Sequence, residues 1–468
     1  MKRAFTLAPT AVVAVVAAAV LAGCSMIPAY QRPEAPVPGA FPYPSATQGA
    51  PASQLEWQQF FGDPRLRALI DRALANNRDL RVAMLNVELA RAQYDVRRAD
   101  LLPTVGAGIA GSRAPTASGG TAKSYTAGLT FSAWEIDFFG RIQALSESAL
   151  AQYFAIEENR RAAQITLVAS VANAWLSLLA DEELLAVTRE TLATREESLR
   201  LTRLRFENGV SSELDFRQAQ SLAEQARATL AQAQRQRALD FDTLTLLVGG
   251  TPPADVVANT SLNAVSLPDV PAGLPSDVLA TRPDVRQAEQ QLRSANANIG
   301  AARAAFFPRI SLTAGIGTAS SELSGLFEGG HWGFTVAPQA LLTIFDAGRN
   351  SANLRAANVQ RDIAVAQYER AIQTAFREIS DALAGRNTLA EQVRAQTAVA
   401  DAEAVRLRLS TMRYEAGVAS FLDLLDAQRS LFTARQGVIT TRLSMLQNQV
   451  LLYRALGGGW TTAQVAAR

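Results

Sequence analysis

The sequence contains one histidine, His331, and one cysteine, Cys24, among 468 residues. A metal site that needs several Cys and His ligands, and a catalytic triad built around histidine within one chain, are therefore excluded. A single cysteine cannot form a disulfide inside the chain. The sequence also lacks any run or cluster of basic residues, so nothing in it indicates nucleic-acid binding. We expect no enzyme activity, no catalytic residue and no metal, and we assign His331 no role.

Charged residues make up only 19% of the chain, while 48% of the residues are apolar. This balance is typical of a folded protein, and it excludes both a disordered chain and a helical membrane protein with many spans. Without Lys2 and Arg3 the chain holds 43 basic and 43 acidic residues, so the remainder carries no net charge.

Residues 1–23 combine a basic start with an apolar run rich in Ala and Val. The length alone also allows an uncleaved membrane helix. The end of the run, Leu21-Ala22-Gly23-Cys24, resembles the lipobox at which bacterial lipoproteins are cleaved and acylated. The resemblance implies that Cys24 becomes the N-terminus and carries diacylglycerol and fatty acyl groups, which anchor it stably. These are the only bound groups we expect. Ser25 follows, and this implies sorting to the outer membrane.

Prolines are concentrated between residues 28 and 51, where seven of them occur. Such a segment stays extended and lies along a surface.

Residues 205–220 and 413–428 are two copies of one motif, RFENGVSSELDFRQAQ and RYEAGVASFLDLLDAQ, at a constant offset. In each copy a helical pattern stops at a glycine, Gly209 or Gly417, the residue type that tolerates the left-handed conformation after a helix end. A serine then precedes a new helix, with Asp215 or Asp423 three residues later, which is the spacing of a capping box. Each copy is therefore predicted to form the end of a helical hairpin.

The copies differ at one informative position, because Asp426 of the second copy replaces Gln218 of the first. Asp423 and Asp426 are three residues apart, so they share a helix face.

Very long helices are predicted on both sides of each motif. Residues 140–208 contain no proline, and at about 1.5 Å per residue they would span roughly 100 Å, far more than a bilayer of about 40 Å. Apolar residues recur there with the spacing of a coiled coil. An ordinary soluble coiled coil would explain these helices. The helices we expect are 64–101, 140–208, 212–247, 282–306, 348–416 and 420–456.

Four stretches instead alternate between apolar and small or polar residues, the pattern of outer-membrane barrel strands. A soluble hairpin pair with one wet face would explain any single strand as well. Four strands cannot close, and an open sheet edge in lipid is not viable, so a barrel would need several chains. The strands we expect are 104–113, 124–136, 309–318 and 332–344.

The sequence therefore predicts two tandem repeats after the extended segment. The organisation we expect is a signal peptide over 1–23, a lipid-anchored extended segment over 24–60, repeat 1 over 61–270, repeat 2 over 271–460 and a tail over 461–468.

This combination resembles the outer-membrane channels of tripartite efflux and secretion systems, the TolC and OprM family, and most closely its lipoprotein (NodT-type) branch. The resemblance depends on the lipobox, the paired strand exits Ile136–Arg141 and Ile344–Arg349, the two hairpin ends and the final Leu456–Trp460. It implies a mainly α fold with a transmembrane β part. Three chains would form a homotrimer with a twelve-stranded β-barrel, four strands from each, continuous with a twelve-helix periplasmic α-barrel.

The resemblance also implies a gate at the hairpin ends. Leu422 falls where the lipoprotein branch has an apolar ring, and Asp423 and Asp426 fall where the family has acidic rings. Carboxylates crowded in a trimer would favour cations and would raise one another's pKa. Tyr414 and Asp215 match positions that hold the closed state in TolC. The arginine that TolC carries five residues after this tyrosine is Ala419 here.

Simpler roles remain open for these residues. Asp215 and Asp423 could serve only as caps, and Asp426 could lie on a solvated face. The residues around the turn glycines could be ordinary exposed positions, although docking of an adaptor protein is the better interpretation. The docking residues we expect are Arg205, Glu207, Gly209, Val210, Arg413, Glu415, Gly417 and Val418.

We therefore expect a passive, gated exit duct of an RND-type multidrug efflux pump in the outer membrane of a Gram-negative bacterium, extending into the periplasm. Its partners would be a periplasmic adaptor, an inner-membrane RND transporter and outer-membrane lipid. Metal efflux and type I protein secretion are alternatives within the channel class. A structural coiled-coil lipoprotein without a channel, and a surface enzyme, are the alternatives outside it.

Overall fold

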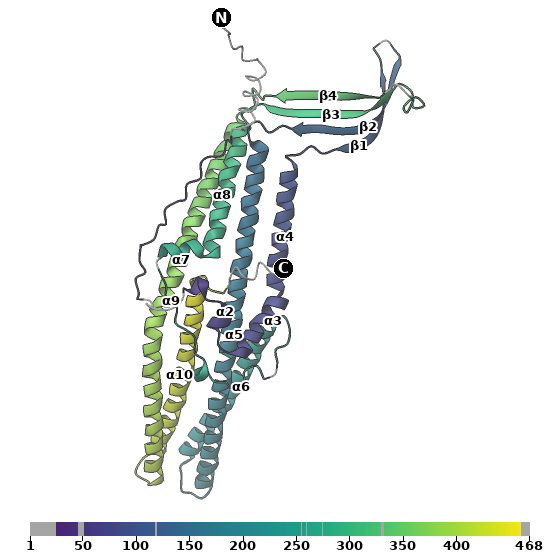
Figure 1. The fold of residues 1–468 in the computed structure, drawn as a ribbon. Coiled ribbons are helices and arrows are strands. Elements are labelled where there is room, and N and C mark those ends of the chain that lie inside the picture. The colour runs from purple at the N-terminus through teal and green to yellow at the C-terminus, as the bar shows by residue number, and fades with distance from the viewer. Residues whose placement is uncertain are drawn as a thin grey trace. The chain divides into compact units, whose positions relative to one another are not determined.

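The structure is a computed structural model, and it describes residues 25–44, 51–117, 119–253, 255–258, 260–273, 275–328 and 332–459 (Figure 1). Cys24, His331 and Trp460, together with the predicted signal peptide and tail, lie outside the described residues. The chain divides into two compact units. The sheet unit contains Leu85–Glu158, Gln287–Arg370 and the described part of the chain before Ala35. The hairpin unit contains Ala35–Met84, Asn159–Arg286 and the chain from Ala371 onward.

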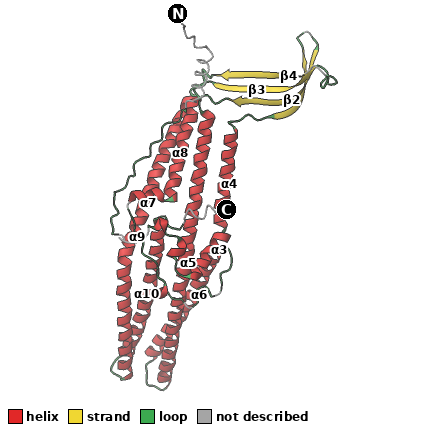
Figure 2. Cartoon of the chain, viewed as in Figure 1, coloured by secondary structure: helices red, strands yellow, loops and turns green. Residues whose placement is uncertain are grey.

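The sheet unit contains one antiparallel sheet, drawn in yellow in Figure 2, and its strand order is β1-β2-β3-β4. The pairing of β2 with β3 joins the first half of the sequence to the second. Within the described chain β1 and β4 each pair on one side only, so the sheet is open. The strands are β1 (Gly106–Pro115), β2 (Thr121–Glu135), β3 (Arg309–Ser320) and β4 (Trp332–Leu341).

One face of this sheet is apolar and exposed. The register places Ile109, Leu129, Ile316 and Phe334 on the same face, and Phe334 is 81% exposed. An apolar face that is this exposed requires a cover that one chain does not provide. The alternation predicted from the sequence is therefore observed in all four strands.

Glycines form a row across the opposite face. Gly108, Gly128, Gly317 and Gly333 are successive register partners, one from each strand. A Cβ atom on Gly317 would lie 2.3 Å from the carbonyl oxygen of Ala127, so no other residue fits there without moving the backbone. The two central strands thus approach so closely that only glycine is accommodated.

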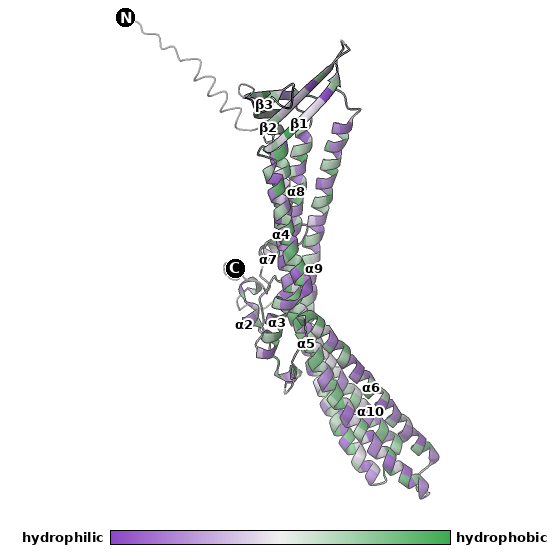
Figure 3. Ribbon diagram, turned by 90° about the vertical axis from the view of Figure 1, so that its right-hand side faces the viewer, coloured by the Kyte–Doolittle hydropathy of each residue, from purple (hydrophilic) through white to green (hydrophobic). Residues whose placement is uncertain are grey.

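The helices include two of 67 residues, α5 and α9. Apolar and polar residues are interleaved along the helices that return from the turns, α6 and α10 (Figure 3). The helices are α2 (Trp57–Phe60), α3 (Pro64–Asn76), α4 (Arg78–Ala99), α5 (Arg141–Glu207), α6 (Glu213–Val248), α7 (Pro275–Thr281), α8 (Pro283–Ala304), α9 (Arg349–Glu415) and α10 (Phe421–Ala455), with short 3-10 turns at Ala52–Gln54 and Leu262–Ala264.

The helix predicted over 64–101 is wrong as a single element, because the structure divides it into α3 and α4 at Asn77. The backbone of Asn77 is extended, with ψ at 131°, so the helix cannot continue through it. Its side-chain oxygen accepts a hydrogen bond from the amide of Leu80 at 2.9 Å, and its side-chain nitrogen donates to the carbonyl of Leu247 at 3.0 Å. These contacts cap α4 and connect it to α6.

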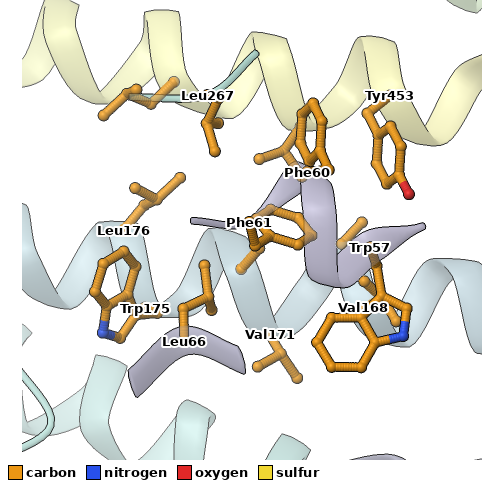
Figure 4. Close-up of a cluster of buried hydrophobic side chains, with 14 of the residues drawn as sticks. Trp57, Phe60, Phe61, Leu66, Val168, Val171, Trp175, Leu176, Leu267 and Tyr453 are labelled. Carbon is orange, nitrogen blue, oxygen red and sulfur yellow. The ribbon is translucent and has the colours of Figure 1, made fainter. Parts of the chain in front are cut away.

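Aliphatic and aromatic side chains together form the core of the hairpin unit (Figure 4). The rings of Phe60 and Tyr453 are stacked with their centres 3.9 Å apart, and the Tyr453 hydroxyl donates to the Leu55 carbonyl at 2.7 Å. Trp175 of α5 is fully buried and donates from its indole to the carbonyl of Val256 at 3.1 Å. The end of the segment predicted to be extended over 24–60 thus folds into this core.

Among the described helices, α5 alone is long and apolar enough to cross a membrane by composition. More than half of its most apolar window is buried, at 56%, because Val168, Val171 and Trp175 pack into the core just described. Packing inside the protein accounts for this apolar stretch.

Candidate functional site at the hairpin ends

The first hairpin turns at Gly209, directly after the end of α5. Gly209 has a φ of 70°, and the amide of Val210 donates to the carbonyl of Arg205 at 2.8 Å. Glu207 forms an ion pair with Arg203 at 2.9 Å on the same helix. The turn is a glycine C-cap, as predicted, and it leaves Val210 exposed.

The second hairpin repeats this geometry after α9. Gly417 has a φ of 75°, and the amide of Val418 donates to the carbonyl of Arg413 at 3.0 Å. Val418 is 66% exposed, the same fraction as Val210, and Glu415 is also exposed. The eight predicted docking residues therefore lie at two equivalent turns of the hairpin unit.

Both predicted aspartates of the capping boxes act as caps. Ser212 pairs with Asp215, and Ser420 pairs with Asp423, each serine accepting from the backbone of its aspartate and each aspartate accepting from the backbone of its serine. The Ser420 hydroxyl also donates to the Asp423 carboxylate at 2.9 Å. The hydrogen bonds from Ser420 hold the pKa of Asp423 below its usual value.

Asp426 lies between two arginines, which the sequence analysis did not select. Its carboxylate accepts from Arg406 of α9 at 2.5 Å and from Arg429 of α10 at 2.7 Å. The bond from Arg406, followed by its charge and by Arg429, lowers the pKa of Asp426. Within one chain the hydrogen-bond donors around Asp423 and Asp426 lower the pKa of both, and the neighbouring Asp426 only partly opposes this at Asp423. The rise predicted for carboxylates crowded in a trimer stays a prediction.

The arginine partners of Asp426 could have been found in part from the sequence. Arg429 lies three residues after Asp426, the spacing that brings two side chains together on a helix. Arg406 becomes adjacent only once α9 and α10 are placed antiparallel about the turn at Gly417, which requires the hairpin itself.

Tyr414 contacts the first hairpin through Arg205 rather than through Asp215. Its hydroxyl accepts a hydrogen bond from Arg205 at 2.7 Å, and the guanidinium lies 5.5 Å from the centre of the Tyr414 ring. Asp215 is bonded to Ser211 and Ser212 in its own turn. The structure therefore brings a predicted gate residue and a predicted docking residue into one contact between α5 and α9.

Leu422 differs from its neighbours in α10. It is 61% exposed, whereas Phe421, Leu424 and Leu425 are buried against Ala219 of α6. Three apolar residues thus hold α10 to the first hairpin, while Leu422 projects away from that cluster.

A buried carboxyl on α5, Asp181, was not selected from the sequence. Burial raises the pKa of Asp181 to about 7, and the neighbouring carboxylates Asp240 of α6 and Glu182 raise it further, while Arg237 opposes them. One oxygen of Asp181 is buried without a described hydrogen-bond partner. No motif marks this pair, because the two aspartates come from helices that meet only in the folded hairpin.

The segment that follows Cys24 lies against α8 of the sheet unit. Asn296 donates to the carbonyl of Pro28 at 2.8 Å, and Arg32 pairs with Glu289 at 2.6 Å. Ile27 packs on Gly300, where a Cβ atom would come within 2.6 Å of its side chain. The segment from Ser25 is therefore extended along a helix surface, as predicted.

Both hairpin ends and the sheet lie within residues that a protein-family model matches. The family model described as outer membrane efflux protein matches residues 69–250 and 274–458. This chain belongs to the outer membrane efflux protein family. The two matched ranges contain one hairpin end each.

Relatives with known names cover nearly the whole chain. The toluene efflux pump outer membrane protein TtgC and the antibiotic efflux pump outer membrane protein ArpC, both of Pseudomonas putida, are each 49% identical over 457 residues, covering 95% of this chain and 94% of theirs. The open state of the MtrE outer membrane channel of Neisseria gonorrhoeae superposes with a TM-score of 0.86 at 42% identity, covering 93% of this chain and 98% of that one.

Membership of the outer membrane efflux protein family explains why one chain combines a four-stranded sheet with very long helical hairpins. The mainly helical, tandem-repeat fold is that of solved outer-membrane channels. The protein is a component of the outer membrane of Gram-negative bacteria.

Proposed function

We propose that this protein is the passive exit duct of a tripartite efflux pump, and that it works as a homotrimer. One observation supports this above the others: a four-stranded sheet with two free edges and an exposed apolar face. Three such sheets joined edge to edge would form a closed twelve-stranded barrel, in which every strand is paired and the apolar face meets lipid. A single chain in water would leave the edges of β1 and β4 unpaired and the apolar face of the sheet exposed.

The helices would continue the duct into the periplasm and close it at the hairpin ends. In a trimer Leu422, Asp423 and Asp426 would each occur three times around the axis. The Arg205–Tyr414 contact and the pairing of Asp426 with Arg406 would hold the closed arrangement. A periplasmic adaptor would open it by binding the splayed ends more tightly than the closed ones.

Channel recordings test the gate. Leu422→Ala should raise the single-channel conductance in planar bilayers, because it removes an exposed apolar side chain from the constriction. Leu214, the equivalent residue of α6 after the first turn, is similarly exposed, at 66% against 61%, so Leu214→Ala is the matched control and should leave conductance unchanged. Equal behaviour of both variants and the natural protein would count against a gate at Leu422.

Adaptor docking would use the two glycine turns. A Cβ atom on Gly417 meets nothing within 4 Å, so Gly417→Trp would place bulk at the surface of the turn. The positive φ strains any replacement, and Gly417→Ala therefore serves as the control that shares the strain without the bulk. We expect the Trp variant alone to lose crosslinking to the adaptor while remaining trimeric. Crosslinking that survives in the Trp variant would exclude docking at this turn.

The cargo would be small organic molecules, since relatives carry the names of antibiotic and toluene efflux pumps. An inner-membrane RND transporter would supply the energy. Susceptibility of a deletion strain to antibiotics, solvents and metal salts tests the cargo class, and sensitivity to metal salts alone would favour metal efflux.

Cys24 would carry the lipid anchor. Labelled palmitate should be incorporated into the natural protein and not into Cys24→Ser. A protein that shows neither lipid labelling nor a heat-modifiable trimer in detergent would exclude an anchored channel and favour a coiled-coil protein without one.

A further inference from the structure

Two cations face each other across the outermost part of the sheet. Arg113 of β1 and Lys123 of β2 are register partners, close to the turn that joins the strands. Both side chains are exposed. Like charges directly opposite each other destabilise an antiparallel pair. A sheet that places them together therefore gains from an anion bound between them.

No carboxylate of the described residues supplies that negative charge. The side chains of Arg113 and Lys123 form no hydrogen bond or ion pair within the part of the chain that the structure describes. The carboxylates at this end of the sheet are Glu322 and Glu328, in the β3–β4 connection, and neither is paired with the two cations. The counter-charge must come from outside one chain.

The pair lies on the apolar face of the sheet. Side chains alternate along a strand, so Arg113 shares its face with Ile109, and Lys123 shares its face with Tyr125 and Leu129. The Tyr125 ring covers Gly111, where a Cβ atom would come within 3.1 Å of it. Tyrosine is typical of the boundary between lipid and water in membrane barrels. The cations thus stand directly beyond an aromatic boundary residue.

The length of β2 places the cations at headgroup depth. From Glu135 to Lys123 the strand runs roughly 40 Å at about 3.3 Å per residue, or roughly 30 Å across the membrane at a tilt of about 40°. Glu135 ends the strand on the helix side, where it binds Arg141 and Arg309. Charged groups therefore bracket an apolar band as thick as the hydrocarbon core of a bilayer.

We infer that Arg113 and Lys123 bind a phosphate of a phosphorylated glycolipid in the outer leaflet, the lipid A part of lipopolysaccharide. The inference rests on the proposed function, because the β1–β2 turn faces outward only if the long helices extend into the periplasm. The arginine fork matches two phosphate oxygens, and the lysine adds a mobile point charge. The acyl chains of the same lipid would cover Ile109 and Leu129 on the same face.

Lys123 offers a direct probe, since Lys2 is the only other lysine in the sequence and lies in the predicted signal peptide. The full-length trimer is reconstituted in phosphatidylcholine bilayers alone, with bis-phosphorylated lipid A, with dephosphorylated lipid A, or with inorganic phosphate in solution. The rate at which a water-soluble acylating reagent modifies Lys123 is followed by mass spectrometry. Of the four conditions, we expect only bis-phosphorylated lipid A to slow the acylation of Lys123, by at least about fivefold, because charge-assisted hydrogen bonds would hold the amine.

Variants separate lipid binding from a structural role. Arg113→Gln should lose most of the protection, whereas Arg355→Gln, the same change at an exposed position of α9, should keep it. Arg113→Glu should form a cross-strand ion pair with Lys123, so the trimer should melt at a higher temperature in bilayers without lipid A. The same variant should retain less lipid A in native mass spectrometry, which a purely structural role would not cause.

Three results would overturn the inference. Dephosphorylated lipid A could protect equally, which would assign the effect to acyl chains. Inorganic phosphate could protect equally, which would show an adventitious ion only. Lys123 could be modified slowly in phosphatidylcholine alone and quickly after Glu328→Gln, which would assign the counter-charge to a neighbouring copy. Conductance recorded on the same samples distinguishes these results from failure of the proposed function, because a conducting trimer without protection contradicts only the lipid site.

Discussion

The hydroxyl of Tyr414 accepts a hydrogen bond of 2.7 Å from Arg205, a residue from the other half of the sequence. The arginine that the family resemblance led us to expect five residues after this tyrosine is absent, since Ala419 stands there. Arg205 gives Tyr414 a cationic partner from α5 instead. A polar link between the two hairpins is thus made by a different pair of residues from the one inferred from TolC.

Removing either partner of this link should loosen the closed state. Arg205 is exposed and Tyr414 is only partly buried, so we expect Tyr414→Phe and Arg205→Gln each to raise the frequency of channel opening only about two- to fivefold. The double variant should equal the stronger single variant, because both remove one contact. Planar-bilayer recordings measure this. Arg203→Gln breaks only a pair within α5 and is the control. Additive effects of the two substitutions would argue against a shared contact.

Asp426→Asn should open the channel more often than Asp423→Asn. Asp426 bridges two helices through Arg406, whereas Asp423 is bonded to its own N-cap. The pKa of Asp426 is lowered, so its contribution is fully present at neutral pH and is lost only as the pH falls below the usual carboxyl range. Conductance of the natural protein between pH 5 and 7 should therefore not depend on this group. An equal effect of both variants would contradict the bridging role.

The carboxyl pair at Asp181 predicts a different pH dependence. The pKa of Asp181 is about 7 in the folded protein against 3.8 ordinarily, so between these values the folded state holds a proton that the unfolded state releases. Stability is therefore full at low pH, falls as the pH rises towards 7 and is constant above it. The expected loss is roughly 1–3 kcal/mol after allowance for solvent screening.

Asp181→Asn should remove that slope and raise the melting temperature near pH 8 by a few degrees, as followed by circular dichroism at 222 nm. Asp242→Asn changes an exposed carboxylate of α6 and should leave the slope intact. A slope that persists in Asp181→Asn would assign it to other groups.

Substitution of glycine by alanine should affect trimer assembly differently at two positions of the glycine row. Gly317→Ala should greatly reduce the yield of heat-modifiable trimer, because its Cβ would lie 2.3 Å from the Ala127 carbonyl oxygen. Gly333 lies in the same row, but a Cβ atom there would meet nothing within 4 Å, so the Gly333→Ala protein should assemble normally. Trimer yield on unheated gels distinguishes them. Similar yields would mean that β2 and β3 can separate without cost to assembly.

Local rules predicted much of this fold. Proline and glycine placed the ends of the long helices within one residue, because those residues act on the backbone directly. The break at Asn77 was missed although its cap, a hydrogen bond from the Leu80 amide, is local, whereas its second bond, to Leu247, needs the fold. The strand faces followed from alternation, but the contact between Gly128 and Gly317 needed the register of strands from different repeats.

At the hairpin ends, too, local features followed from the sequence and contacts between helices did not. The caps at Asp215 and Asp423 follow from three-residue spacing alone. The partners of Tyr414 and Asp426 lie on helices that run alongside, and a single sequence does not show which turns of those helices meet.

The pairing of β2 with β3 also has a consequence for biogenesis. β3 is synthesised and exported only after more than a hundred further residues have followed β2. Until β3 follows, the hairpin of β1 and β2 has one unpaired edge and an uncovered apolar face, a state prone to aggregation. We therefore expect the β1–β2 segment to be bound by a chaperone until β3 follows.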